Sequence, residues 1–174
     1  FIIVGAGSAG CVLAGNLAAS GKYSVLLLEA GPDRNTFWQK TPLGYGHSIV
    51  NGAVNWMYAS EPEAGLNGRS IPVPRGKIVG GSSAINAMVY MRGTRADYAE
   101  WAREGNPEWD WDKVLASYKR MENHCIRDAW HGSDGPLQVS SRASVAHPVC
   151  NAFLEAGQQL QYRRNDDFNG ERVE

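Results

Sequence analysis

Residues 1–31 read FIIVGAGSAGCVLAGNLAASGKYSVLLLEAG, and this stretch decides the fold. The apolar run at 1–4 is typical of a strand buried on both faces. Small and apolar residues then recur at helical spacing over 8–19, which predicts a helix with one face packed on a sheet. A second apolar run at 23–28 predicts another buried strand, and Gly21 is suited to end the helix before it. The stretch therefore predicts a parallel strand–helix–strand unit of the α/β class.

Three glycines follow the first strand with the spacing G-x-G-x-x-G, at Gly5, Gly7 and Gly10. Gly5 permits a tight turn, Gly7 lets the backbone approach a pyrophosphate, and Gly10 lets the helix pack on the strand. The pyrophosphate is expected at the positive N-terminus of the helix. Glu29 ends the second strand and can accept hydrogen bonds from both ribose hydroxyls, which favours FAD or NAD over NADP. The alternative is that this parallel strand–helix–strand unit binds no dinucleotide.

Composition excludes several functional classes. The chain has 174 residues, with 17 basic and 18 acidic side chains and a net charge of -1, so nucleic acid is not an expected partner. Its apolar runs have the length of strands, so no membrane span is expected in this segment. Three cysteines without metal-ligand spacing favour reduced thiols, a cytoplasmic location and no metal site. Because the sequence opens inside a strand, we expect a segment of a longer chain.

A second glycine turn lies in RGKIVGGSSAINAMVYMRG, residues 75–93. Glycines without side chains let the backbone touch a planar or charged ligand, and a hydroxyl and an amide nearby add polar contacts. The residues that could contact a ligand in this way are Arg75, Gly80, Gly81, Ser82 and Asn86. Apolar residues from 85 to 89 predict a buried helix after the turn. On composition alone, the segment is a glycine turn whose serines cap a core helix.

Five motifs occur in order along the chain: GAGSAG, LLLEAG, PRGKIVGGSSAINAMVYMRG, DYAEWA and HGSDGPLQVS. Together they resemble the N-terminal part of the glucose-methanol-choline (GMC) oxidoreductase family of flavoproteins. They are most similar to its choline dehydrogenase and alcohol dehydrogenase branch. The resemblance implies an FAD-binding Rossmann-like βαβ domain of the GMC type over residues 1–140. It implies the start of an α+β substrate-binding domain over residues 141–174.

The resemblance further implies that both glycine-rich segments serve one FAD. The cofactor-binding residues expected in the first segment are Gly5, Gly7, Ser8, Ala9, Gly10, Glu29 and Ala30. Those expected in the second are Arg75, Gly80, Gly81, Ser82, Asn86 and Ala87. Family members that attach flavin covalently often carry a histidine just before this asparagine. Ile85 stands there and forms no such bond, so a non-covalent FAD is expected.

The activity that the resemblance implies is oxidation of an alcohol, either choline-like or another primary alcohol. A base removes the hydroxyl proton while a hydride passes from the carbinol carbon to flavin N5. The family's catalytic histidine and its histidine or asparagine partner are expected beyond residue 174, so no catalytic residue is assigned here and the segment alone is expected to be inactive. The electron acceptor, oxygen or a quinone, stays open. The alternatives are a flavin-containing hydroxynitrile lyase of the same family, a non-catalytic nucleotide-binding fragment and an NAD-dependent Rossmann enzyme.

The rest of the chain predicts further elements: a hairpin around Asn67 and Gly68, helices over 96–105, 110–124 and 147–162, and a strand after a turn at 131–136. The last helix is expected to turn its apolar face inward. His131 and His147 flank a turn or a helix start, and both are interpreted as structural.

Overall fold

The computed structural model describes residues 1–33, 37–141 and 145–172. They form two compact units, Phe1–Val89 and Tyr90–Glu174, and each is described by itself. The domain boundary expected at residue 140 stays a prediction.

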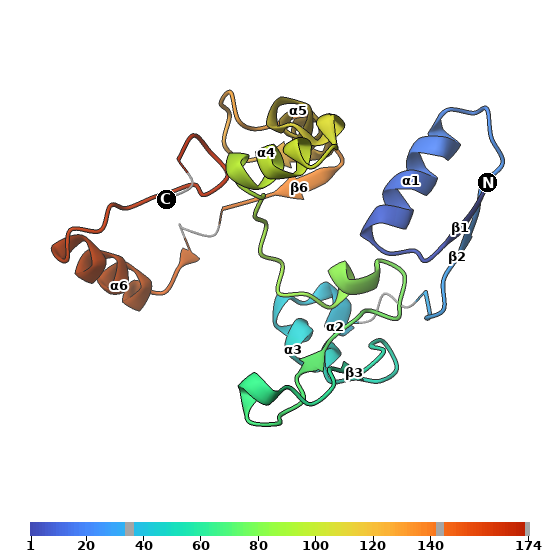
Figure 1. Cartoon of the computed structure of the whole chain (residues 1–174), viewed down its shortest axis with the longest axis horizontal. Helices are drawn as coiled ribbons and strands as arrows, with labels where there is room; N and C mark the ends of the chain where they lie inside the picture. The colour runs from blue at the N-terminus through green and yellow to red at the C-terminus, as the bar shows by residue number, and fades with distance from the viewer. Residues whose placement is uncertain (34–36, 142–144, 173–174) are drawn as a thin grey trace. The chain divides into compact units, whose positions relative to one another are not determined.

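The first unit opens with the predicted strand–helix–strand arrangement. Strand β1 (Ile2–Val4) leads into helix α1 (Ser8–Ala19), and strand β2 (Leu26–Leu28) returns beside β1 in parallel. Figure 1 shows α1 alongside the two strands. Gly5 and Gly21 have φ angles of 97° and 66°, values that only glycine adopts readily, and they mark the turn into the helix and the turn out of it.

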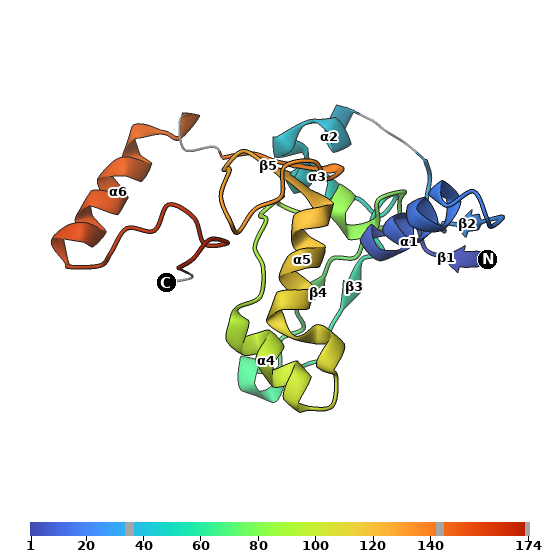
Figure 2. The ribbon, with the colours of Figure 1, turned by 90° about the horizontal axis from the view of Figure 1, so that it is seen from above.

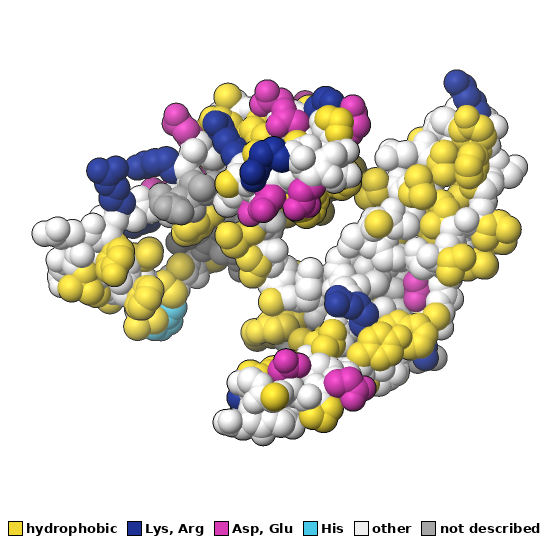
Figure 3. Space-filling model, in the orientation of Figure 1, with side chains coloured by type: hydrophobic (Ala, Val, Ile, Leu, Met, Phe, Trp, Pro, Cys, Tyr) yellow, Lys and Arg dark blue, Asp and Glu magenta, His cyan; other side chains and the backbone are white. Residues whose placement is uncertain are grey.

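These strands are not buried, contrary to expectation. Ile2 is 70% exposed and Val4 84%, although Ile3 between them is buried. All residues of α1 are described, and none of them is buried. A two-stranded sheet with one helix beside it cannot bury both faces. Figure 3 shows the resulting hydrophobic side chains along this part of the unit.

Residues 37–73 form short elements, as the many glycines and prolines there predict. They are helix α2 (Phe37–Lys40), 3₁₀-helix η1 (Pro42–Gly44), helix α3 (Tyr45–Ser48), strand β3 (Tyr58–Ala59), 3₁₀-helix η2 (Ala64–Leu66) and strand β4 (Pro72–Val73). Strands β3 and β4 are antiparallel. Their connection turns at Asn67 and Gly68, both with positive φ, which confirms the predicted hairpin.

The second glycine turn contains 3₁₀-helix η3 (Gly81–Ala84), but the helix predicted after it does not form. Met88 has a φ of 61°, which interrupts helical geometry, and the Asn86 side chain accepts the Met88 amide at 3.0 Å. Ile85 is buried with Val54 and Ile78 in a small core, so one apolar residue of the run is enclosed. The prediction failed because an asparagine side chain competes with the helix for backbone amides.

The second unit contains the three predicted helices, α4 (Arg95–Arg103), α5 (Trp111–Met121) and α6 (Pro148–Gln159), and an unpredicted 3₁₀-helix, η4 (Pro107–Trp109). The helix predicted over 110–124 ends at Met121, and residues 122–124 form a strand instead. Strands β5 (Glu122–His124) and β6 (Leu137–Val139) pair in parallel. Figure 2 shows α5 running from the α4 region to β5.

The apolar face of α6 does not turn inward as predicted. Phe153 is 79% exposed and Leu160 is 73% exposed. Across the described ranges, no helix is both long enough and apolar enough to span a bilayer.

Candidate cofactor site

The two glycine turns of the first unit touch each other. The Gly80 amide donates to the Ala6 carbonyl at 2.7 Å. A Cβ atom built on Gly81 would lie 2.7 Å from the Cα of Gly7, closer than real Cβ atoms approach backbone. Segments far apart in the sequence therefore meet backbone to backbone, and the absence of side chains on both sides permits it.

Within the first turn, the glycines differ in what surrounds them. A Cβ on Gly10 would lie 1.9 Å from the Gly5 carbonyl oxygen, so only glycine fits where α1 crosses the end of β1. A Cβ on Gly7 would meet its nearest neighbour at 3.9 Å, so the backbone there is open to a ligand. Ser8 and Ala9 begin α1 and are exposed, and their amides lie in its first turn. This is the geometry that a pyrophosphate needs.

Glu29 fastens the first turn to the end of β2. Its Oε2 accepts the Ala6 amide at 2.8 Å, and its Oε1 accepts the Gly31 amide at 2.9 Å. Each carboxylate oxygen has a second acceptor site, so the pair can still receive two ribose hydroxyls. Ala30 beside it is exposed. The carboxylate is thus held in place by the protein before any ligand arrives.

The second turn is held by polar groups that point to its own backbone. Ser82 Oγ accepts the Gly76 amide at 3.1 Å, and the Gly81 amide donates to the Ile78 carbonyl at 2.7 Å. A Cβ on Gly76 would lie 2.1 Å from the Gly81 carbonyl oxygen, which makes Gly76 a further obligatory glycine. The Ser82 hydroxyl accepts here, and its proton is available to a ligand.

Three residues expected at the cofactor lie apart from this contact. Arg75, Asn86 and Ala87 are exposed. Within the described residues, no hydrogen bond joins their side chains to the first turn. Asn86 instead accepts the amide of Met88. Their roles at the cofactor stay predictions.

Asn55 is a residue that the sequence did not single out. It is 3% exposed, and its Oδ1 accepts the amides of Arg75 and Met57 at 2.9 and 3.1 Å. Its Nδ2 donates to the Ile49 carbonyl at 2.6 Å. Asn55 therefore fixes the stem that leads into the second glycine turn. The sequence holds no signal for this role, because an asparagine in a loop is usually exposed.

Replacing Asn55 with alanine is expected to lower both stability and cofactor affinity. The substitution leaves two amides and a carbonyl without their partner in a buried place, at a cost of about 1–3 kcal/mol. The readouts are the melting temperature and the FAD dissociation constant of the complete protein. Asn51→Ala is the control, because the Asn51 side chain accepts the local amide of Ala53 and holds no distant segment among the described residues. Equal effects of the two substitutions would contradict the role given to Asn55.

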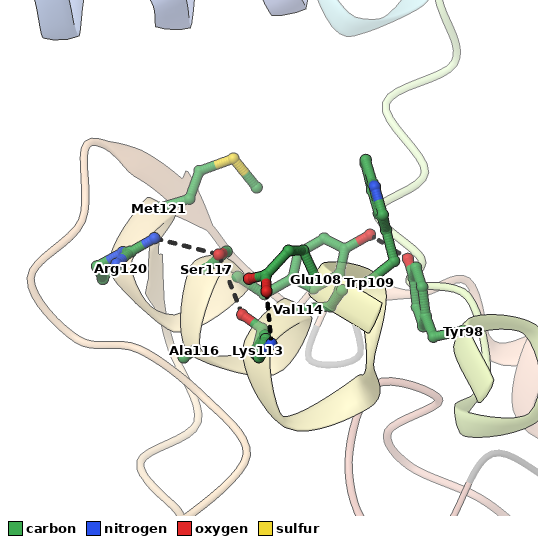
Figure 4. A pocket seen from close by; sticks show the side chains of 10 residues that line it. Tyr98, Glu108, Trp109, Lys113, Val114, Ala116, Ser117, Arg120 and Met121 are labelled. Carbon is green, nitrogen blue, oxygen red and sulfur yellow. Dashed lines mark hydrogen bonds and ion pairs between the residues drawn. The ribbon is translucent and has the colours of Figure 1, made fainter. Parts of the chain in front are cut away.

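A groove in the second unit offers no catalytic arrangement. Figure 4 shows its lining on α5 together with Tyr98 and Trp109. Its polar groups pair with one another: Tyr98 Oη lies 2.8 Å from Tyr118 Oη, and Lys113 lies 3.0 Å from Glu108. Burial, followed by the hydrogen bond with Tyr98, raises the pKa of Tyr118. Tyr118 is therefore not a base poised near neutral pH.

Asp128, His131 and Asp167 bring ligand-type atoms within 4.8 Å of one another. These atoms already serve hydrogen bonds: Asp167 Oδ2 lies 2.8 Å from His131 Nε2, and Asp128 Oδ1 accepts the amides of Trp130 and His131. We assign no metal to them.

The sequence model of the GMC oxidoreductase family matches residues 1–174. The chain belongs to the GMC oxidoreductase family. An oxygen-dependent choline dehydrogenase of Photobacterium profundum is 42% identical over 172 residues, which are 98% of this chain and 30% of that protein. The chain thus spans about a third of the length of the curated relatives it matches.

Solved structures agree with this assignment. Pyridoxine 4-oxidase from Mesorbium loti superposes with a TM-score of 0.85 at 37% identity, over 91% of this chain and 31% of that one. An FAD-dependent oxidoreductase from Chaetomium thermophilum superposes with a TM-score of 0.78 at 30% identity, over 91% of this chain and 29% of that one. The expected resemblance and the α/β FAD-binding fold class are confirmed.

Proposed function

We propose that this GMC segment holds the FAD of an enzyme that oxidises the CH–OH group of a small alcohol. The contact between the two glycine turns carries the proposal, because it gathers both turns in one place where one extended ligand can lie along them. Choline and pyridoxine, for which two of the relatives are named, each carry a primary hydroxyl. A choline-like or other primary alcohol is therefore the proposed substrate class.

In this proposal each part of the site has a distinct task. The first turn of α1 and the open backbone at Gly7 receive the pyrophosphate. Glu29 receives the ribose hydroxyls, already oriented by the Ala6 and Gly31 amides. Gly80, Gly81 and Ser82 approach the flavin end of the cofactor. FAD, when bound, supplies the acceptor for the hydride. The base that takes the hydroxyl proton is proposed to lie beyond residue 174.

An absorption spectrum of the complete protein before and after acid precipitation tests the proposal. We expect oxidised-flavin bands that move into the supernatant, because Ile85 replaces the histidine that binds flavin covalently in other members. Ile85 is also only 2% exposed and packs against Val54 and Ile78. Flavin that stays in the pellet would show covalent attachment at another residue. A protein that retains no flavin after reconstitution with FAD would refute the proposal.

The electron acceptor in this proposal is oxygen or a quinone. The choline dehydrogenase relative is named as oxygen-dependent, which supports oxygen. Alcohol-dependent oxygen uptake, compared with reduction of a soluble quinone under argon, separates the two. A cyanohydrin cleavage assay tests the lyase alternative on the same preparation.

We also propose a cytoplasmic location. Cys11, Cys125 and Cys150 are all free thiols in the structure, which suits a reducing compartment. Fractionation of cells that express the complete protein is the direct measurement.

A further inference from the structure

Four charged side chains are enclosed together in the second unit. Arg92 and Glu122 have side chains that are 2% and 0% exposed, His131 is 0% exposed, and Asp167 is 20% exposed. Each comes from a different segment of the unit. Buried charges of this kind need partners, and the donors and acceptors can be counted one by one.

Glu122 accepts from several directions. Its Oε1 accepts Arg92 Nη2 at 2.5 Å and the Gly132 amide at 2.8 Å, and its Oε2 accepts Tyr90 Oη at 2.9 Å. Burial alone would raise the pKa of Glu122, but the hydrogen bonds from Gly132, Arg92 and Tyr90 outweigh it and hold that pKa below its usual range. Glu122 is therefore ionised at neutral pH and has no proton to donate.

The Asp167 carboxylate is also ionised and accepts hydrogen bonds. Its Oδ1 accepts the Asn169 amide at 2.9 Å, and its Oδ2 lies 2.8 Å from His131 Nε2. Burial works to raise the pKa of Asp167, but the hydrogen bonds with His131 and Asn169 lower it further than burial raises it. Asp167 is likewise an acceptor only.

His131 lies between these two carboxylates. Its Nδ1 is 3.2 Å from Glu122 Oε1, and its Nε2 faces Asp167. Because neither carboxylate has a proton to give, both ring nitrogens must donate, and a ring that donates from both nitrogens carries a positive charge. With Arg92, the cluster then holds two positive and two negative charges and is neutral as a whole.

The other titratable groups around His131 agree with this charge. His124 stacks on the ring at 3.8 Å, and its Nδ1 accepts the Ile126 amide at 3.0 Å, so His124 is neutral. Burial and then the nearby His131 lower the pKa of His124. Burial and the hydrogen bond to Glu122 raise the pKa of Tyr90 to about 12, so Tyr90 stays protonated. Asp128 accepts the backbone amide of His131.

The charge cluster joins residues that are distant in the sequence. Asn169 Oδ1 accepts the Arg92 amide at 2.8 Å, and Asn169 Nδ2 donates to the Tyr90 carbonyl at 2.9 Å. Asp167 in turn accepts the Asn169 amide, so the Asp167–His131 pair anchors the same short stretch. Residues 165–170 are therefore held at two points: Asn169 bonds directly to Tyr90 and Arg92, and Asp167 bonds to His131.

We propose that His131 is a buried imidazolium that latches Asp167, and with it residues 165–170, in place, and that loss of its proton loosens this stretch. Without the proton, the lone pair of Nε2 faces the Asp167 carboxylate, and the enclosed cluster has a net charge of -1. The latch is therefore closed while the ring is protonated between two ionised carboxylates and opens when the ring loses its proton. The pairing contributes stability while the ring carries its proton, and that contribution is lost when the proton leaves.

Nitrogen-15 NMR of the complete protein, labelled at histidine and loaded with its cofactor, tests the charge directly. We expect both ring nitrogens of His131 to be protonated at pH 7. The Asp167→Asn substitution identifies the signals, because its amide can donate to Nε2 and should leave His131 neutral. An unprotonated His131 nitrogen in the unsubstituted protein at pH 7, or a stoichiometric divalent metal bound there, would overturn the proposal.

Hydrogen exchange across residues 165–170 tests the latch. After correction for the intrinsic rate, protection is expected to fall over the pH range in which NMR shows His131 losing its proton and to level off where NMR shows His131 neutral. Asp167→Asn should remove this pH dependence, whereas His47→Gln, in the first unit, should retain it. Protection that does not change with pH in the unsubstituted protein, or a fall that His131 deprotonation does not accompany, would count against the latch.

Discussion

Gly10→Ala is expected to abolish retention of FAD by the complete protein. A Cβ at this position would lie 1.9 Å from the Gly5 carbonyl oxygen and 3.1 Å from the Gly5 carbonyl carbon. Backbone atoms cannot rotate away as a side chain can, so the start of α1 must shift from the end of β1. The first turn of this helix is where we place the pyrophosphate. We expect the FAD dissociation constant to rise by about 100-fold, which corresponds to about 2.8 kcal/mol.

The measurement is FAD titration of the apoprotein, followed by flavin fluorescence. Gly15→Ala is a matched control in the same helix, since a Cβ there has no described atom within 4 Å. That substitution should leave FAD binding unchanged and stabilise α1 by about 1 kcal/mol, because alanine is the better helix former. If both variants bound FAD equally well, the role of the Gly5–Gly10 contact would be disproved.

Glu122→Leu is expected to be the most destabilising single change in the second unit. The substitution leaves the guanidinium of Arg92 buried without its counter-ion and removes the acceptor of the Gly132 amide and the Tyr90 hydroxyl. Breaking a buried ion pair from one side costs about 3–5 kcal/mol. The melting temperature of the complete protein should fall by several degrees.

Glu108→Gln serves as the control for that experiment. Glu108 pairs with Lys113 at 3.0 Å, but their side chains are 82% and 52% exposed, and such surface pairs contribute little. The melting temperature of the control should equal that of the unsubstituted protein within experimental scatter. If the Glu122→Leu variant had the same melting temperature as the Glu108→Gln control, the buried cluster would not support the fold.

The parts of the fold that the sequence predicted correctly depend on near neighbours in the chain. The helix over Ser8–Ala19, the tight turn at Gly5 and the hairpin at Asn67 and Gly68 each follow from a few consecutive residues. The FAD cofactor was then predicted from a family resemblance that several motifs carry. The interpretation of His131 as structural agrees with its enclosed, paired position.

The parts that the sequence did not predict depend on contacts between distant segments. Nothing near Asn55 in the sequence indicates that it supports a turn twenty residues later. The pairing of Glu122 with Arg92 and His131 is equally invisible, since charged residues are rarely enclosed. The strands of the first unit and helix α6 were expected to be buried because apolar patterns normally are. In the described residues most of these apolar side chains are instead exposed.

The hydrogen bond between Gly80 and Ala6 has a consequence for synthesis of the protein on the ribosome. About 75 residues separate its two ends, and at 5–20 residues per second their translation takes roughly 4–15 s. During that interval the emerging β1–α1–β2 unit has no second turn to close against, and the Ala6 carbonyl lacks its donor. Nascent chains halted in this window should therefore be cleaved more readily at the first turn by a protease, and protection should follow emergence of the second turn.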